Sequence, residues 1–413
     1  MTASRRQILQ LLSALPFLSP THLFAQNQIL TDRANRIRSV ISEWSAQGIH
    51  RTGTDVDASS AEWLAHRMRE YGVTANLDSL QLERVEVLVA SLEFDGLQME
   101  GIPLFDCTYT DANGITGTLG SIGSAADIGV IMLPPSTASP LHTQLDEARR
   151  NNSHKAMIAV TDLSYPREGI AVINAEDFRE PVGPPVLQIA NTHWEALQQA
   201  MSANRTATVV AQCERVPATA YNVSARIAGR NPTLAPMVIM TPRSSWWEST
   251  SERGGGIAMF LELARDLAAN LPERDILFTA NTGHELSHLG LDQYLHDRPT
   301  LIQDASVWIH LGANFAARGS LIRLQYSDER FREIAHRRLG ALNLQPGIET
   351  PIGQRPLGEA RNIFDGGGNF LSILGNNPLF HHPQDLWPDA VDLDTTTQWT
   401  AAFSVIALEL SKA

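Results

Sequence analysis

The sequence predicts an α/β protein: a three-layer α/β/α sandwich around a mostly parallel mixed sheet, together with a β-rich insert domain. Two observations lead to this fold class. After Ala218, short apolar runs alternate with longer amphipathic segments, the pattern of strands alternating with helices. Between about 85 and 215, short β-branched runs follow one another between Gly, Asn, Asp and Pro. The first pattern is typical of a sheet with helices on both faces, and the second of a separate β-rich module.

The alternating part contains three predicted strands and one predicted helix. The strands are 236–240, 276–280 and 306–311, and the helix is 256–271, where apolar residues recur on one face. In open α/β sheets, ligands bind beyond the carboxyl ends of the strands. The residues that follow these three strands are therefore the first place to look for chemistry.

A further helix and the insert precede this part. Ser59 and Glu62 fit a capping box, apolar residues follow at helical spacing, and Gly72 is expected to end that helix. The insert carries both cysteines, Cys107 and Cys213, but no cluster of His or carboxylates at ligand spacing. We therefore expect the chemistry to lie outside the insert, and the sequence leaves open whether the two cysteines are bridged.

Composition narrows the function classes. A chain of 413 residues is long enough for two or three domains. Its 45 acidic residues outnumber 32 basic ones and give a formal net charge of −13, which argues against a nucleic-acid partner. The oligomeric state cannot be deduced from the sequence.

Residues 1–25 are predicted to be a twin-arginine signal peptide. Arg5 and Arg6 precede a mainly apolar run that is interrupted by Ser and Pro and ends near Ala25. The run is shorter than the roughly 20 residues of a spanning helix, which weighs against the alternative of a membrane anchor. We therefore expect a periplasmic or secreted protein with no membrane anchor after cleavage.

Ionisable residues gather where the predicted strands end and in two later turns. One segment, 284–288, reads His-Glu-Leu-Ser-His directly after the second strand. Such residues near strand ends are candidates for metal binding or proton transfer. The candidates are Arg243, Glu252, His284, Glu285, His288, His310 and His381.

In the order and spacing of these segments, the chain resembles the zinc exopeptidase family M28, which includes bacterial aminopeptidases and has the glutaminyl cyclases as relatives. The resemblance implies a discontinuous peptidase domain over 26–84 and 219–413, with a protease-associated insert over 85–218. It also implies a hydrolase acting on peptide or amide bonds, whose partner is a peptide or small amide substrate.

The resemblance implies one zinc ion, where the family holds two. The family's His-x-Asp motif falls on Arg243 and Ser245, and its strand-end Asp falls on Gly312, so these three positions have lost their ligands. Three ligands with an open position suffice for a catalytic zinc. The positions that keep a ligand are Glu252, Glu285 and His381.

The resemblance also suggests roles for two neighbours of this site. His284 falls where the family has its general base, and an imidazole with a reference pKa near 6.5 is able to accept a proton from water. Arg243 could anchor a substrate carboxylate with its planar fork, or fill the place of the lost metal with its own charge.

Two other interpretations stay open. The string from His284 to His288 matches H-E-x-x-H, in which both histidines bind zinc and Glu285 is the base, although the strand just before it argues against the continuous helix that this motif requires. His310 is a further alternative ligand that could reach the cleft left by the missing Asp. The second interpretation is an inactive pseudo-peptidase that keeps the fold without the metal and serves as a binding or scaffold protein.

Overall fold

The structure is a computed structural model that describes residues 20–136 and 139–412. Arg5 and Arg6, on which the predicted export signal depends, lie outside the described residues. Within the described part of the chain, no helix is long and apolar enough to cross a membrane.

The part of the sheet that belongs to the main body has the strand order β7-β9-β8-β10-β13-β11-β12. Its central strands β9, β8, β10 and β13 run parallel, while β7 and β11 pair antiparallel with their neighbours. The strands are β7 (Thr206–Ile227), β8 (Met237–Pro242), β9 (Ile276–Asn281), β10 (Val307–Leu311), β11 (Arg323–Tyr326), β12 (Ile348–Glu349) and β13 (Phe370–Leu374). The three strands predicted from apolar runs are thus confirmed as β8, β9 and β10.

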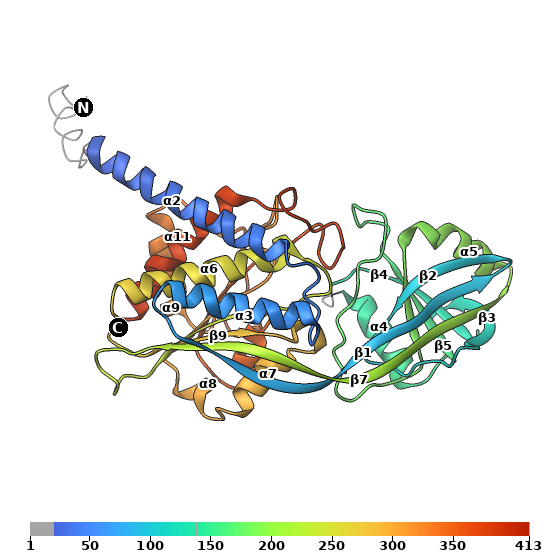
Figure 1. Ribbon diagram of the computed structural model, residues 1–413. Coiled ribbons are helices and arrows are strands. Elements are labelled where there is room, and N and C mark those ends of the chain that lie inside the picture. The colour runs from blue at the N-terminus through green and yellow to red at the C-terminus, as the bar shows by residue number, and fades with distance from the viewer. Residues whose placement is uncertain (1–19, 137–138, 413) are drawn as a thin grey trace, which may run out of the picture.

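Helices cover both faces of this sheet, which confirms the predicted three-layer sandwich (Figure 1). Alternate side chains of β8 point to opposite faces, as the pleat requires: Met237 and Ile239 enter one core, and Val238 and Met240 the other. The first core is completed by α2 (Pro20–Ser45), α3 (Asp55–Glu70), α6 (Thr250–Ala269), α9 (Glu329–Gly340) and α11 (Leu393–Leu410). The second is completed by α7 (Leu289–His296), α8 (Leu301–Asp304) and α10 (Ala360–Asp365).

Two long strands connect the main body to the insert (Figure 1). Strand β1 (Ala75–Phe94) pairs antiparallel with β7 from Ala75 opposite Ala225 to Glu93 opposite Thr208. The predicted insert boundaries at 85 and 218 fall inside this ribbon. The rest of the insert consists of β2 (Leu97–Pro103), β3 (Ile115–Ser121), β4 (Ile128–Leu133), β5 (Ala156–Thr161), β6 (Val186–Ile189), the helices α4 (Pro140–Arg150) and α5 (Trp194–Ser202), and the single turn η1 (Asn191–His193).

The start of α3 differs from the capping box expected at Ser59. The helix begins one turn earlier, because Thr54 is the N-cap and its hydroxyl accepts a hydrogen bond from the backbone N–H of Asp57 at 3.2 Å. The prediction for its end is confirmed: α3 ends at Glu70, and Gly72 has a φ of +78°. The earlier start places Asp57 inside the helix, where it faces the candidate site described below.

Candidate functional site

The candidate site lies beyond the carboxyl ends of β8, β9 and β10. Arg243 follows β8, His284 and His288 follow β9, and His310 is the second-last residue of β10. Glu252 comes from the first turn of α6, and His381 from the loop between β13 and α11. The topology therefore brings the ionisable segments of the sequence to one edge of the sheet, as predicted.

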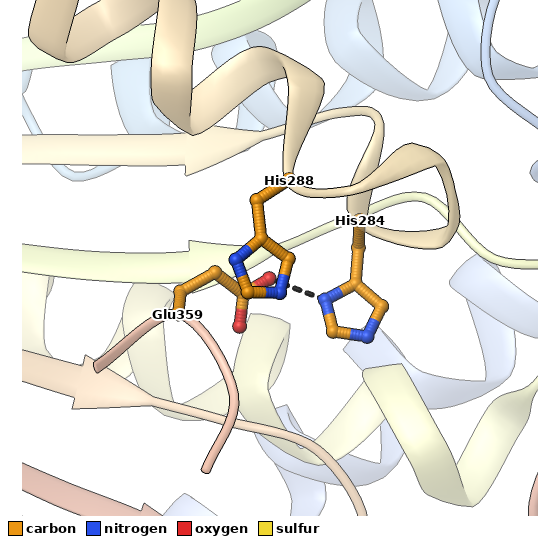
Figure 2. Close-up of side chains that lie close together, drawn as sticks. All are labelled: His284, His288 and Glu359. Atoms are coloured by element: carbon orange, nitrogen blue, oxygen red, sulfur yellow. Dashed lines mark hydrogen bonds and ion pairs between the residues drawn. The ribbon is translucent and has the colours of Figure 1, made fainter. Parts of the chain in front are cut away.

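Two histidines and a glutamate converge at this edge (Figure 2). His284, His288 and Glu359 each offer a ligand atom, and these atoms lie within 4.8 Å of one another. All three side chains are buried. Among the described residues, this is the one group of three or more His, Cys, Asp or Glu side chains with such geometry. We call it the His-His-Glu cluster.

The two histidines meet without a continuous helix. His284 starts a single turn, η2 (His284–Leu286), and Ser287 and His288 then adopt the left-handed conformation, with φ of 59° and 58°. Only after this reversal does α7 begin. The imidazole rings lie stacked, with centroids 5.2 Å apart. The H-E-x-x-H string thus does bring its two histidines together, but through a broken turn.

Hydrogen bonds fix the orientation of each member of the cluster. Glu359 lies 2.5 Å from Nδ1 of His284 through Oε1, and its Oε2 lies 3.0 Å from Nε2 of His310. Nδ1 of His288 lies 2.7 Å from the Asn362 side-chain oxygen, which leaves Nε2 facing the cluster. The other ring nitrogen of His310 bonds the Ser372 hydroxyl at 2.8 Å, so His310 supports Glu359 from behind.

The environment favours the protonation states that a metal ligand requires. Burial lowers the pKa of His288 to about 4, which keeps its imidazole neutral at physiological pH. Burial alone would raise the pKa of Glu359, but the neighbouring His284 and His288 hold it well below its ordinary value. One neutral imidazole and one carboxylate are therefore ready to donate lone pairs.

Two glycines make the room that His310 occupies. A Cβ at Gly312 would lie 2.7 Å from Cε1 of His310, and a Cβ at Gly358 would lie 2.9 Å from the same atom. Gly312 is the position at which the family resemblance places a metal-binding Asp. The absence of a side chain at Gly312 gives the His310 ring its space, and the ring in turn holds Glu359.

The predicted ligands Glu252 and His381 lie close together, but an arginine shares their site. Oε1 of Glu252 is 3.4 Å from Nε2 of His381 and 2.7 Å from Nη2 of Arg253. Burial alone would raise the pKa of Glu252, but the charge of Arg253, followed by that of His381, lowers it to about 2. The Arg253 guanidinium is 1% exposed and also donates through Nε to the carbonyl of Ser244 at 2.8 Å. A fixed positive charge thus accompanies these two residues.

The third predicted ligand, Glu285, binds neutral donors instead. Its Oε1 accepts from the backbone N–H and the hydroxyl of Thr52 at 2.9 and 2.6 Å, and its Oε2 accepts from the Ser244 hydroxyl at 2.6 Å. The structure therefore does not bring Glu252, Glu285 and His381 together as one ligand set. A zinc ion on these three residues stays a prediction from the resemblance.

Arg243 is placed where a substrate cannot touch it. Its side chain has no exposed surface, and Nη1 pairs with Oδ1 of Asp57 at 3.0 Å. The same guanidinium donates to the backbone carbonyls of Asp57 and Tyr221. Because every donor side of the fork faces protein, the predicted role as substrate anchor finds no support, and Arg243 instead ties α3 to the end of β8.

Sequence reasoning missed Glu359, Arg253, Thr52 and Asp57. Glu359 lies in a stretch between β12 and α10 that has no periodic pattern and no recognised motif. The one available signal was Gly358 directly before it, since glycine is typical of turns that need a positive φ, and Gly358 has a φ of 64°. Arg253 follows Glu252 directly, and the helical start there gave no reason to expect both side chains at one site.

Two hollows lie near the site. A polar one of about 350 Å³ has His288 and Asn362 in its wall, together with charged side chains from α7, α10 and the insert. A larger and more apolar one of about 760 Å³ lies between the main body and the insert and includes Phe105, Trp246 and Trp247. The first hollow reaches the His-His-Glu cluster through His288, whereas no cluster residue lines the second.

Comparison with known proteins shows the fold to be that of zinc aminopeptidases. No family model matches the sequence, and no curated protein matches it. Solved structures do match over nearly the whole chain. These include BSAP, a zinc aminopeptidase from Bacillus subtilis, with a TM-score of 0.74 and 18% identity over 91% of this chain and 94% of that one.

Two further structures agree with this likeness. The aminopeptidase from Aneurinibacillus sp. strain AM-1 matches with a TM-score of 0.68 and 17% identity, covering 92% of each chain. The Peptidase M28 precursor from Shewanella amazonensis matches with a TM-score of 0.73 and 14% identity, over 94% of this chain and 96% of that one. At these identities the likeness shows the fold, which agrees with the fold that the sequence resemblance implied.

Proposed function

We propose that this protein is a metal-dependent hydrolase of peptide or amide bonds, with a single zinc ion held by His284, His288 and Glu359. The observation that carries the proposal is the convergence of these three buried side chains at the carboxyl edge of the sheet. Two imidazoles and one carboxylate, with an open fourth position, form a ligand set that catalytic zinc sites use. The aminopeptidase fold is the background that makes amide hydrolysis the preferred chemistry.

The residues around the cluster support this chemistry. A zinc ion at this site would polarise the scissile carbonyl and lower the pKa of a bound water. His310 hydrogen-bonds Glu359, and Asn362 hydrogen-bonds His288. Such bonds to the side chains that bind a metal fix the orientation of those side chains. Glu252 and Arg253 place one carboxylate and one guanidinium near His284. In this proposal His284 binds the metal. It therefore does not serve as the general base that the sequence predicted.

Zinc content tests the proposal. We expect about one zinc ion per folded mature chain, measured by elemental analysis after loading and gel filtration. His288→Ala should remove the ion because it deletes one of three ligands, and Glu359→Gln should do so because it replaces the anionic carboxylate with a neutral amide, a much poorer zinc ligand. The matched control is His381→Ala, which should keep it. Circular dichroism of every variant would show that the fold is retained.

The outcomes separate the three interpretations. Loss of zinc in His381→Ala with retention in His288→Ala would favour the ligand set Glu252, Glu285 and His381. A wild-type chain that binds no zinc would contradict the proposal and favour the metal-free binding protein. The observation that favours this second candidate is the Arg253 guanidinium, which already supplies a buried positive charge beside Glu252 and His381.

We also propose that the chain is exported by the twin-arginine route. The support is the sequence alone, with Arg5 and Arg6 before a short apolar run. Replacing both with lysine should leave full-length precursor in the cytoplasm, whereas the unchanged chain should be processed near Ala25. Mass spectrometry of the fractionated cells would decide this, and an intact Met1 on exported protein would contradict it.

A further inference from the structure

One segment of the insert covers the candidate site. Residues 165–176, here called the roof segment, leave the sheet of the insert after β5 and contact the main body at several points. The Tyr165 hydroxyl donates to the carbonyl of Phe380 at 2.9 Å, and His381 and Val172 exchange two hydrogen bonds, from Nδ1 of His381 at 2.6 Å and from the Val172 N–H at 3.2 Å. The roof segment is thus fixed to the loop that carries His381.

The same segment reaches the two sides of the His-His-Glu cluster. The N–H of Ala175 donates to the carbonyl of Glu285 at 2.9 Å, next to His284. Glu176 then accepts an ion pair from Arg361 at 2.8 Å, two residues beyond Glu359. Val172 and Ala175 are buried, so the segment lies packed on the site. A folded polypeptide substrate would have to displace these contacts to reach the cluster.

The polar hollow reaches the cluster through His288, beside this cover. His288 lines it, and so do the charged side chains Glu176, Asp292, Arg355, Arg361 and Asp365. A volume of about 350 Å³ is near the lower end of the range for small-molecule sites. Its wall is almost entirely polar, so an apolar side chain would gain little by entering it. The opening therefore suits a small molecule with charges of its own.

The charges in the wall have both signs. Arg361 and Glu176 pair across the boundary between main body and insert, and Arg355 pairs with Asp365 at 2.5 Å. Asp292, half-buried, accepts from the amide of Asn362 at 2.9 Å, and Asn362 also bonds His288. Guanidinium groups bind a carboxylate through their planar fork, and the carboxylates of the wall can receive an ammonium group.

Resting on the proposed function, we propose that the substrate is a small zwitterionic amide of about dipeptide size. It enters through the polar hollow, with its carboxylate on Arg361 and its ammonium group on Glu176 and Asp292, so that its amide carbonyl faces His288 and the cluster. In this arrangement the substrate replaces the ion pair between Arg361 and Glu176 by two pairs of its own. The larger apolar hollow at Trp246 has no part in this recognition, because no cluster residue lines it.

Binding of a minimal probe tests this inference on the full mature chain. We would measure glycylglycine by titration calorimetry and compare it with its capped analogue, N-acetylglycylglycine amide, which has the same amide but no charges. Glycylglycine should bind at least about ten-fold more tightly than the capped analogue, the ratio expected for one charge-assisted contact. Arg361→Gln and Glu176→Gln should each weaken glycylglycine by about ten-fold or more and leave the capped analogue unchanged.

A matched control comes from the neighbouring ion pair of the insert. Arg150 pairs with Asp177 at 2.7 Å but does not line the hollow, so Arg150→Gln should bind glycylglycine as the wild type does. Equal binding of the capped analogue, no binding of glycylglycine, or unchanged binding in both Arg361→Gln and Glu176→Gln would overturn the inference.

The zinc content of the same samples keeps the two proposals separate. Because the charged contacts involve Arg361 and the carboxylates of the wall, the preference for the uncapped probe should hold with and without zinc. Zinc-free protein that keeps this preference would support the charged binding site while contradicting the metal-dependent hydrolase. Zinc-loaded protein without the preference would leave the hydrolase intact and remove the zwitterionic substrate.

Discussion

At the scale of single residues, two buried arginines distinguish this site from the metal-rich pattern that the sequence resembles. The resemblance places Arg243 at the first ligand position of the family, and Arg253 directly follows Glu252. Each forms an ion pair with a buried carboxylate: Arg243 pairs with Asp57, and Arg253 pairs with Glu252. A guanidinium cannot be a metal ligand, because it stays protonated at all accessible pH values. Both residues therefore stabilise the fold around the site by charge pairing.

The pair of Arg243 and Asp57 gives a direct test of this structural role. Both side chains are fully buried, and Asp57 also accepts from Gly53 and Thr282. Arg243→Met should lower the free energy of unfolding by about 3–5 kcal/mol, because it leaves a buried carboxylate without its counter-charge. Asp57→Leu should cost a similar amount, and the double variant should cost less than the sum of the two.

Urea unfolding of the four proteins measures this coupling. The exposed pair of Arg150 and Asp177 is the control, and Arg150→Gln should leave the midpoint of urea unfolding close to that of the wild type. Arg243→Met with wild-type stability would show that the pair is not a structural element of the site, and would return Arg243 to consideration as a substrate anchor.

At the scale of elements, helix α6 positions Glu252 and Arg253 because three glycines follow them. A Cβ at Gly255 would lie 2.5 Å from Cβ of Ala316, and one at Gly256 would lie 2.7 Å from the hydroxyl of Thr241. The absent side chains let the helix approach the sheet closely at the end where the site lies. At Gly254 the nearest atom would be a methyl group of Ile41 at 3.1 Å, a contact that a side chain can relieve.

These distances predict a graded response to alanine. Gly255→Ala and Gly256→Ala should each destabilise the protein by about 1–3 kcal/mol, because the added methyl group overpacks the contact with the neighbouring chain. Gly254→Ala should stay within about 1 kcal/mol of the wild type, since the better helix propensity of alanine offsets a mild clash. Thermal unfolding of the three variants measures the order, and equal effects at all three positions would contradict it.

The elements also show how far sequence reasoning reaches. Strands β8, β9 and β10 were predictable because their apolar runs are short and bounded by polar residues, and the strand-end rule then located the site. The cluster itself was not, because His284 and His288 meet through a turn with two left-handed residues, and Glu359 arrives from 75 positions further along the chain. Helical spacing in the sequence predicts neither the turn between the two histidines nor the distant contact with Glu359.

At the scale of the whole molecule, the insert belongs to the candidate site. The insert has no cluster of His or carboxylates at ligand spacing, which predicts chemistry outside it, and the histidines and Glu359 of the cluster do lie in the main body. Yet the roof segment of the insert covers the site through contacts of Val172, Ala175 and Glu176 with the main body. Residues that cover a site make backbone contacts without a recognisable motif, so a pattern of ionisable side chains could not reveal them.

The long ribbon of β1 and β7 has a consequence for how the chain is made. During synthesis, β1 leaves the ribosome while its partner is still more than one hundred residues from being translated. At about 5–20 residues per second, β1 waits for several seconds with an unpaired edge, which is a ready template for pairing with another chain. Its sequence from 75 to 94 contains four acidic residues and one basic one. Mutual repulsion between these carboxylates would keep nascent copies apart until β7 arrives and the insert closes over the cluster.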